Sequence, residues 1–310
     1  MLRELKKTLR SFGFAACSVI KPQEVSPLFR KFYDRWLEEK PKGVLNYLEN
    51  NKGIKYNVSA LFPEAKSLIV ALYPYYHSEV EIALKKSPYK IARYAWGFDY
   101  HHVVKEVFSQ ALFSLGFSRE EFRVVVDSTP VNERYLARGA SLGFIGRNGM
   151  LIHPKGGSYF FIALAFTSRK LRARRWQTVD PRQDMDQWCR NCHLCVKACP
   201  TSALRGDGTM KVELCLSYLT IENRGETLEY PKKTRSHRWV FGCDICQQVC
   251  PYNKRPWQTP NPDFRPHVVA RAFSQGSLCF SRKELRQSAL SRAGKKGLKR
   301  NLAAVEKLAI

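Results

Sequence analysis

Residues 189–200, CRNCHLCVKACP, and residues 243–251, CDICQQVCP, carry the clearest structural signal in this chain. The first run places three cysteines at intervals of three residues, and a fourth cysteine follows four residues later, directly before a proline. The second run has the same ending but one cysteine fewer, and Cys215 upstream can supply the missing thiolate. Cysteines at such short intervals, in a chain whose N-terminus lacks secretory features, indicate metal ligands rather than a disulfide framework.

The spacing of the first run is that of two-cluster bacterial ferredoxins. Three of its thiolates can hold three corners of one 4Fe–4S cubane, while the fourth reaches a second cubane. Crossed ligation then accounts for eight of the ten cysteines: one cluster would be held by Cys189, Cys192, Cys195 and Cys250, and the other by Cys199, Cys215, Cys243 and Cys246. A pair of structural zinc sites is the alternative, although zinc usually takes its ligands as two separated pairs. Cys17 and Cys279 stand apart and are expected to be ordinary thiols.

The net charge is the second signal. The 310 residues include 52 Lys and Arg against 27 Asp and Glu, a formal charge of +25. An excess of this size predicts a polyanionic partner, and nucleic acid before a membrane. We find no apolar stretch near the roughly 20 residues that a membrane helix needs. The N-terminus also lacks the apolar core of a signal peptide, so a cytoplasmic protein is expected.

The first 170 residues alternate between helical and strand-like patterns, which predicts an α/β or α+β domain. Helices are expected at 2–14, 26–50 and 104–115, and strands at 15–20, 66–76, 122–128 and 158–168. The polar and basic residues 169–188 are expected to form a linker or surface loop. The cysteine-rich module follows, and the chain ends in a basic segment with a helical pattern.

Several motifs in fixed order resemble the epoxyqueuosine reductases over nearly the whole chain. They are RYAWGFDYHHVVK (93–105), VDSTPVNERYLARGASLGFIGRNGMLI (126–152), GSYFFIALAF (157–166), CLSYLTIE (215–222) and FGCDICQQVCPYN (241–253). The resemblance implies an α+β protein with three parts: a cobalamin-binding, nitroreductase-like α/β domain at 1–183, a ferredoxin-like module with two 4Fe–4S clusters at 184–256, and a short helical tail at 257–310. It also implies base-off cobalamin and reduction of epoxyqueuosine to queuosine at the tRNA wobble position. Two electrons and two protons enter this reaction, and one water leaves.

The same resemblance assigns roles to individual residues. Asp127 corresponds to the proton donor, and an apolar cofactor face beside it is expected to raise its pKa; capping the end of a strand is the simpler alternative. Glu133 is the second candidate for the acid, with a pairing to Arg134 as the competing interpretation. His101 and His102 are expected to be structural or solvated. The residues expected beside cobalamin are Lys55, where the family usually has an arginine, and Asp127, Asn148, Leu151, Cys243 and Asp244.

The tRNA partner is expected to contact the basic C-terminal part of the chain. Arg224, in TIENRG, matches a substrate-contacting stretch of the family. The terminal helix carries further candidates for phosphate contacts, which give affinity without sequence recognition: Arg292, Lys295, Lys296, Lys299 and Arg300. An external electron donor of the flavodoxin or ferredoxin type and a monomeric state are expected.

Two other functions fit parts of the sequence. A related cobalamin and iron–sulfur reductase, like a dehalogenase, would act on a small molecule, but a small neutral substrate gives no reason for a charge of +25. A non-enzymatic electron carrier would need only the cysteine module. About 180 residues precede that module, which argues against a simple carrier.

Overall fold

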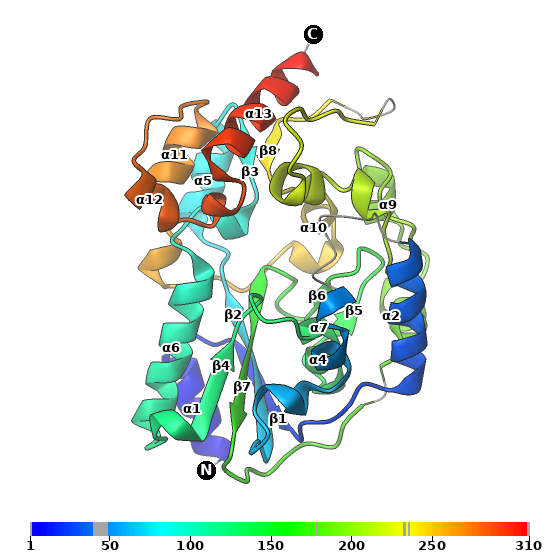
Figure 1. Ribbon diagram of the computed structural model, residues 1–310, viewed down its shortest axis with the longest axis vertical. Helices are drawn as coiled ribbons and strands as arrows, with labels where there is room; N and C mark the ends of the chain where they lie inside the picture. The colour runs from blue at the N-terminus through cyan, green and yellow to red at the C-terminus, as the bar shows by residue number, and fades with distance from the viewer. Residues whose placement is uncertain (1, 40–48, 178, 232–233, 235, 309–310) are drawn as a thin grey trace.

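The computed structural model describes residues 2–39, 49–177, 179–231, 234 and 236–308. Its central element is a four-stranded antiparallel sheet with the strand order β1-β2-β7-β4 (Figure 1). The strands are β1 (Ala16–Ile20), β2 (Ser67–Pro74), β7 (Phe160–Thr167) and β4 (Phe122–Val125). All four strands lie where the apolar runs of the sequence predict them.

Both faces of this sheet are covered, which explains why its central strands are apolar throughout. Successive side chains of a strand point to opposite faces, so Ile69 and Ala71 of β2 pack on one face and Leu68 and Val70 on the other. Helices α1 (Leu2–Ser11) and α6 (Tyr100–Ser114) cover the first face, and α4 (Lys52–Tyr56) and α7 (Glu133–Gly139) the second (Figure 1). Polar functional groups are therefore expected at the ends of the strands and not on the faces of the sheet.

The predicted helices agree with the structure where it describes them. Helix α6 contains the predicted apolar face and ends before Gly116, whose φ of 76° is a conformation that glycine adopts readily. Helix α2 (Pro27–Glu39) begins where a helix is predicted at 26–50. Residues 40–48 of that prediction lie outside the described residues.

The described part of the chain also forms two small sheets. β3 (Lys90–Ile91) pairs in parallel with β8 (Trp239–Phe241), which joins the N-terminal half to the cysteine-rich module. β5 (Phe144–Ile145) and β6 (Leu151–Ile152) form a hairpin. Gly149 in its turn has a φ of 72°, and a Cβ there would lie 2.9 Å from the carbonyl oxygen of Gly208. The turn therefore needs glycine to pass close to the module.

The segment 169–188, expected as a linker or loop, is in part helical. It contains α8 (Pro181–Asp184) and most of a π-helical turn, η4 (Met185–Cys189). The buried carboxylate of Asp184 accepts hydrogen bonds from the Arg138 side chain at 2.7 and 2.8 Å and from the Ile145 backbone at 3.0 Å. A polar sequence therefore forms an ordered junction here because its acid is paired inside the protein.

The segment 257–310, expected as a tail, contributes to the protein interior. Phe273, Leu290 and Leu298 belong to the same buried cluster as α1 and α6. The helices are α11 (Val268–Ser274), α12 (Arg282–Arg286) and α13 (Gly294–Lys307). The fully buried Asn301 of α13 donates from Nδ2 to the carbonyls of Thr220 (2.7 Å) and Val240 (2.9 Å). Helix α13 is thus anchored to the cysteine-rich module.

The remaining α-helices in the described residues are α5 (Ser78–Lys86), α9 (Leu194–Ala198) and α10 (Ile245–Gln248). Short 3₁₀ or π-helical turns, besides η4, are η1 (Val58–Leu61), η2 (Arg93–Ala95), η3 (Arg119–Glu121), η5 (Val212–Leu214), η6 (Tyr218–Glu222), η7 (Pro251–Asn253), η8 (Pro262–Phe264) and η9 (Ala289–Arg292). Within the described parts of the chain, no helix combines the length and apolar character needed to cross a membrane.

Candidate functional site

Four thiols from the two cysteine runs form one group of electrostatic neighbours. Burial raises the pKa of Cys195 to about 11, and the nearby thiols of Cys189, Cys250 and Cys192 add to the rise. Burial also raises the pKa of Cys250, with further contributions from Cys189 and Cys192. The chain folds so that Cys250, from the second run, joins three cysteines of the first.

The other four thiols form a second group. Burial raises the pKa of Cys246, with the largest thiol contribution from Cys215, and burial raises the pKa of Cys215, to which the thiol of Cys199 contributes. Burial raises the pKa of Cys243, and its neighbours Cys246 and Cys215 contribute. Cys199, from the first run, therefore lies with cysteines of the second, as crossed ligation requires.

This donor set fits iron–sulfur clusters chemically. Buried thiols resist ionisation, and a bound cluster supplies the positive charge that stabilises eight thiolates. Among the described residues, no three His, Cys, Asp or Glu side chains are arranged to hold a single metal ion. The fit therefore rests on the grouping and chemistry of the thiols.

The second thiol group is held close to the N-terminal half of the chain. Gly242, directly before Cys243, has a φ of 64°, and a Cβ there would lie 2.6 Å from the Cβ of Ala92. The Gly242 backbone also donates to Oγ1 of Thr220 at 2.9 Å. A larger residue would push the cysteine loop away from β3.

Asp127 lies in the turn after β4, where three elements meet. Its φ of 53° is a strained conformation for a non-glycine residue. Oδ2 accepts a hydrogen bond from the Tyr100 hydroxyl and lies 3.4 Å from Nε2 of His101. Its backbone N–H donates to Oε1 of Glu133, the first residue of α7, at 2.6 Å. The Asp127 side chain is 61% exposed, so an external molecule can reach its carboxylate.

The pKa values of this network favour a protonated His101 beside an ionised Asp127. Desolvation opposes the charged Asp127 carboxylate, but hydrogen bonds from His101 and Tyr100 outweigh it and hold its pKa below the usual value. Desolvation likewise opposes a charged His101, yet its hydrogen bonds to Asp127 and Asp99 raise its pKa to about 9. The expected rise in the pKa of Asp127 is therefore wrong in this structure. His101, expected to be structural or solvated, is part of the site.

Glu133 is the carboxyl group that stays protonated here. Desolvation, and then the charge of Asp127, raise the pKa of Glu133 to about 8. The Arg134 guanidinium donates instead to the carbonyl of Gly149. Among the described contacts, Glu133 and Arg134 form no ion pair, so the expected pairing is not found. Glu133 instead supports the Asp127 turn by accepting the hydrogen bond from the Asp127 backbone N–H.

Three residues expected beside cobalamin have distinct surroundings. Lys55 is buried, its ammonium lies 5.7 Å from the centre of the Tyr33 ring, and it makes no ion pair with a described carboxylate. The buried Asn148 has its Nδ2 3.5 Å from the carbonyl of Cys246. Leu151 packs in the apolar core beneath the second face of the sheet. Lys55 and Asn148 thus carry polar donors, whereas Leu151 is apolar and buried.

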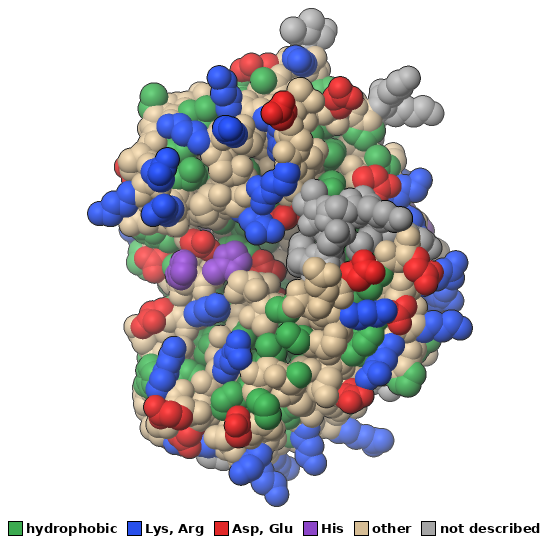
Figure 2. Space-filling view, viewed as in Figure 1, with side chains coloured by type: hydrophobic (Ala, Val, Ile, Leu, Met, Phe, Trp, Pro, Cys, Tyr) green, Lys and Arg blue, Asp and Glu red, His purple; other side chains and the backbone are tan. Residues whose placement is uncertain are grey.

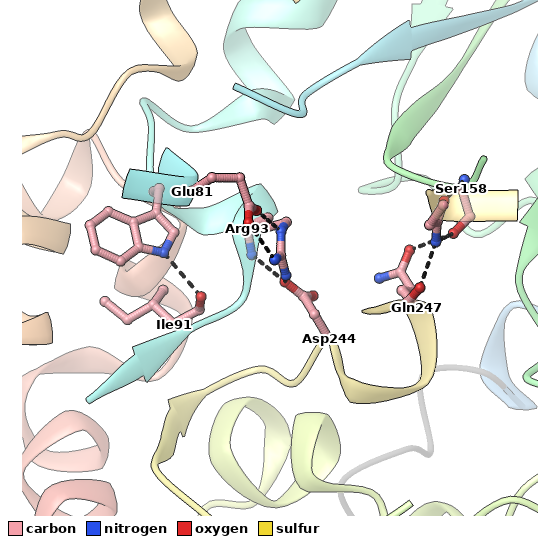
Figure 3. A network of polar contacts seen from close by, with 8 residues as sticks. Glu81, Ile91, Arg93, Ser158, Asp244 and Gln247 are labelled. Atoms are coloured by element: carbon pink, nitrogen blue, oxygen red, sulfur yellow. Dashed lines mark hydrogen bonds and ion pairs between the residues drawn. The ribbon is translucent and has the colours of Figure 1, made fainter. Parts of the chain in front are cut away.

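Asp244 faces the protein and not open space. Its carboxylate accepts from the backbone N–H of Arg93 at 2.8 Å and from Nη1 of Arg93 at 3.0 Å (Figure 3). Tyr94 follows Arg93 in the sequence. Burial raises the pKa of Tyr94, and the charges of Asp127 and Asp244 both add to this rise. Tyr94 therefore lies within electrostatic reach of both Asp127 and Asp244, which lies between Cys243 and Cys246 in the sequence.

The predicted tRNA-binding residues lie on α13 or close to it, and they make different contacts. Lys and Arg side chains gather on the visible face of the C-terminal part of the molecule (Figure 2). Arg224 donates to the carbonyl of Arg292, and Arg292 pairs with Glu222 at 2.8 Å. Arg300 donates to the carbonyls of Asn223, Gly225 and Leu219, so its guanidinium supports the neighbouring loop. Lys295, Lys296 and Lys299 are exposed.

A cavity of about 650 Å³ lies at the opposite edge of the sheet, beside the start of β1. Cys17, Arg138, Trp188 and Trp257 are among its lining residues. None of the predicted catalytic, cobalamin-binding or tRNA-binding residues lines it. Trp188 precedes Cys189, so the cavity adjoins the first thiol group instead.

Comparisons with known proteins agree with this arrangement. A family model described as epoxyqueuosine reductase QueG, DUF1730, matches residues 55–128, and one described as a 4Fe-4S double cluster binding domain matches residues 188–253. The chain is 34% identical to an epoxyqueuosine reductase of Leadbetterella byssophila, over 99% of this chain and 98% of that protein. It is 33% identical to one of Pseudomonas aeruginosa, over 87% and 75%.

Solved structures share the fold. A crystal structure of epoxyqueuosine reductase with an epoxyqueuosine-modified tRNA-Tyr stem loop has a TM-score of 0.79 at 24% identity, covering 99% of this chain and 81% of that one. The enzyme from Streptococcus thermophilus has a TM-score of 0.75 at 23% identity, covering 100% and 81%. These matches show that the chain shares its fold with those enzymes.

Proposed function

Because this chain belongs to the epoxyqueuosine reductase family, we propose that it reduces epoxyqueuosine to queuosine at the tRNA wobble position. Both carbon–oxygen bonds of the epoxide break, and an alkene forms. The oxygen takes up two protons and leaves as water, while two electrons enter. The observation that carries this proposal is the combination, in one chain, of the Asp127 network and two groups of four thiols. The alternative of a small-molecule reductase has no observation that favours it.

Two 4Fe–4S clusters and a base-off cobalamin are the cofactors of this proposal. The clusters are held by the two thiol groups described above. Lys55 and Asn148 offer donors for the carboxamides of the corrin, Leu151 offers an apolar wall, and Cys243 and Asp244 contribute backbone. The bound cobalamin supplies the low-potential cobalt that makes epoxide reduction feasible. The corresponding division of the chain is a nitroreductase-like domain at 1–183, a ferredoxin-like module at 184–256 and a helical segment at 257–310.

Protein side chains supply the protons. The departing oxygen needs a general acid within hydrogen-bond reach. Asp127 is ionised before the reaction, and its carboxylate passes on to the oxygen a proton taken from the imidazolium of His101, whose Nε2 lies 3.4 Å from Oδ2. Glu133 holds a further proton at neutral pH, since its pKa is about 8. The site thus stores the two protons that the reaction consumes.

The tRNA binds with its phosphates on the basic surface around α13. Arg224, Arg292, Lys295, Lys296 and Lys299 contact the backbone, and Arg300 shapes the loop that presents Arg224. Such contacts orient the anticodon stem, while the modified base must be unstacked to reach Asp127. The enzyme works as a monomer in the cytoplasm, where its tRNA substrate is found, with electrons from a flavodoxin or ferredoxin type of donor.

The decisive experiment is a single-turnover assay. Protein reconstituted anaerobically with iron, sulfide and cobalamin is mixed with an epoxyqueuosine-containing stem loop and a chemical reductant. Nucleoside mass spectrometry should detect queuosine. Unchanged epoxyqueuosine, with both clusters and cobalamin bound and reduced, would contradict the proposal.

A further inference from the structure

A buried chain of charges links helix α5 to the loop that carries Cys243 and Cys246 (Figure 3). The Arg93 guanidinium pairs with Glu81 of α5 and lies 3.0 Å from Oδ2 of Asp244. The Arg93 and Asp244 side chains are only 7% and 2% exposed. Burying these charges is costly unless each keeps its partners, so removing one of them should disturb the other.

Asp244 couples this chain directly to the proposed cluster ligands. It follows Cys243 and precedes Cys246 by two positions, so its carboxyl group lies inside the ligand loop. The backbone N–H of Arg93 donates to the same oxygen at 2.8 Å, which holds the loop against β3 and η2. Arg93 therefore both anchors the loop and offsets the charge beside the cluster.

A second network holds the same loop without charges. The Ser158 hydroxyl donates to Oε1 of Gln247 at 2.9 Å, and Nδ2 of Asn253 donates to the carbonyl of Gln247 at 2.8 Å (Figure 3). The loop thus has a neutral anchor at one end and a charged one at the other. Holding the loop in place would not by itself require a buried Arg93 between the carboxylates of Glu81 and Asp244.

We infer that Arg93 is a positioning residue whose charge, balanced against Asp244, sets the reduction potential of the cluster held by Cys199, Cys215, Cys243 and Cys246. Reduction adds negative charge to a cluster, so a nearby cation favours it and a nearby anion opposes it. Arg93 thereby controls how readily this cluster accepts an electron. The inference rests on the proposed cluster ligation.

The test is a redox titration of the reconstituted holoenzyme followed by EPR. Cys215→Ser and Cys250→Ser variants assign each signal to its cluster. Asp244→Asn should move the midpoint of the Cys243 cluster to more positive potential, and Arg93→Gln should move it to more negative potential. Arg93→Lys, which keeps the charge, should stay near the wild-type value. The midpoint of the other cluster should not change in these variants.

A matched control exists at the other cluster. Arg138 pairs with the buried Asp184 at 2.6 Å, and the charge of Asp184 reaches the thiol of Cys189. Arg138→Gln should therefore shift only the midpoint of the Cys189 cluster. If Asp244→Asn keeps its iron and leaves the midpoint unchanged, or shifts both clusters alike, the inference is wrong. A wild-type protein without cubane EPR signals would instead overturn the proposed ligation itself.

Discussion

Nε2 of His101 lies 3.4 Å from Oδ2 of Asp127, and Nδ1 of the same imidazole lies 2.7 Å from Asp99. The ring therefore bridges two carboxylates, which favours its protonated form. Asp99 caps the start of α6 by accepting from the His101 backbone, so the helix terminus itself orients the imidazole. A proton source is thus built into the helix that faces the Asp127 turn.

Replacing Asp127 should remove proton donation without removing the cofactors. Asp127→Asn keeps the size of the side chain but cannot supply the proton, and general acids typically contribute about 10²- to 10⁴-fold. Single-turnover rates should fall by a factor in this range, with iron and cobalamin contents unchanged. Wild-type rates in this variant would exclude Asp127 as the acid.

The stability that His101 provides should depend on pH. The folded-state pKa of about 9 exceeds the ordinary value of 6.5, so its interactions stabilise the protein fully below pH 6.5 and are lost as pH rises through 9. The groups facing the ring are Asp99, Asp127 and the stacked Tyr100. The unfolding free energies of wild type and His101→Gln, measured by denaturant titration, should therefore converge above pH 9. A constant difference across this range would contradict the assigned protonation.

Single cysteine replacements should separate the two clusters. Cys215→Ser removes a ligand of one group and Cys250→Ser a ligand of the other. Each variant should lose up to about half of its iron and one of two EPR signals. Zinc in place of iron in anaerobically isolated protein, or loss of the same signal in both variants, would contradict crossed ligation.

Binding of tRNA should weaken steeply with salt because phosphate contacts release counterions. The double variant Lys296→Ala/Lys299→Ala should reduce the slope of log affinity against log salt by about one for each lost contact. Lys6→Ala/Lys7→Ala, on α1 at the far end of the molecule, removes the same charge and serves as the control (Figure 1). Equal effects of the two variants would indicate a diffuse field rather than a binding surface.

The anchor of α13 should matter for stability. Asn301→Ala leaves the buried carbonyls of Thr220 and Val240 without their donor, which costs about 1–3 kcal/mol per unsatisfied group. Unfolding free energy should fall accordingly, whereas exposed Lys299→Ala should change it by less than about 0.5 kcal/mol. An Asn301→Ala variant as stable as wild type would show that the helix is only loosely attached.

The sequence predicted the strands well because they depend on local patterns, and the assignment of the thiols as cluster ligands, also a local pattern, stays a prediction. The buried strands are continuous apolar runs, and the cysteine intervals indicate cubane ligation whatever surrounds them. The charge networks were missed. Arg93 and Asp244 are 151 positions apart, and Asp184 lies in a segment whose polarity predicted a loop. Nothing in these local sequences distinguishes a buried charge from a solvated one.

The sequence by itself determined the four-stranded sheet elements, the eight thiols and, through its motifs, the family. Only the tertiary structure decided the pKa values of the site residues. Asp127, His101 and Glu133 come from a turn and two helices, and packing brings them into one hydrogen-bonded group. A pKa depends on desolvation and on neighbouring charges, which are properties of the folded surroundings and not of the residue. That is why the pKa of the Asp127 carboxyl group is lowered, whereas that of the Glu133 carboxyl group is raised.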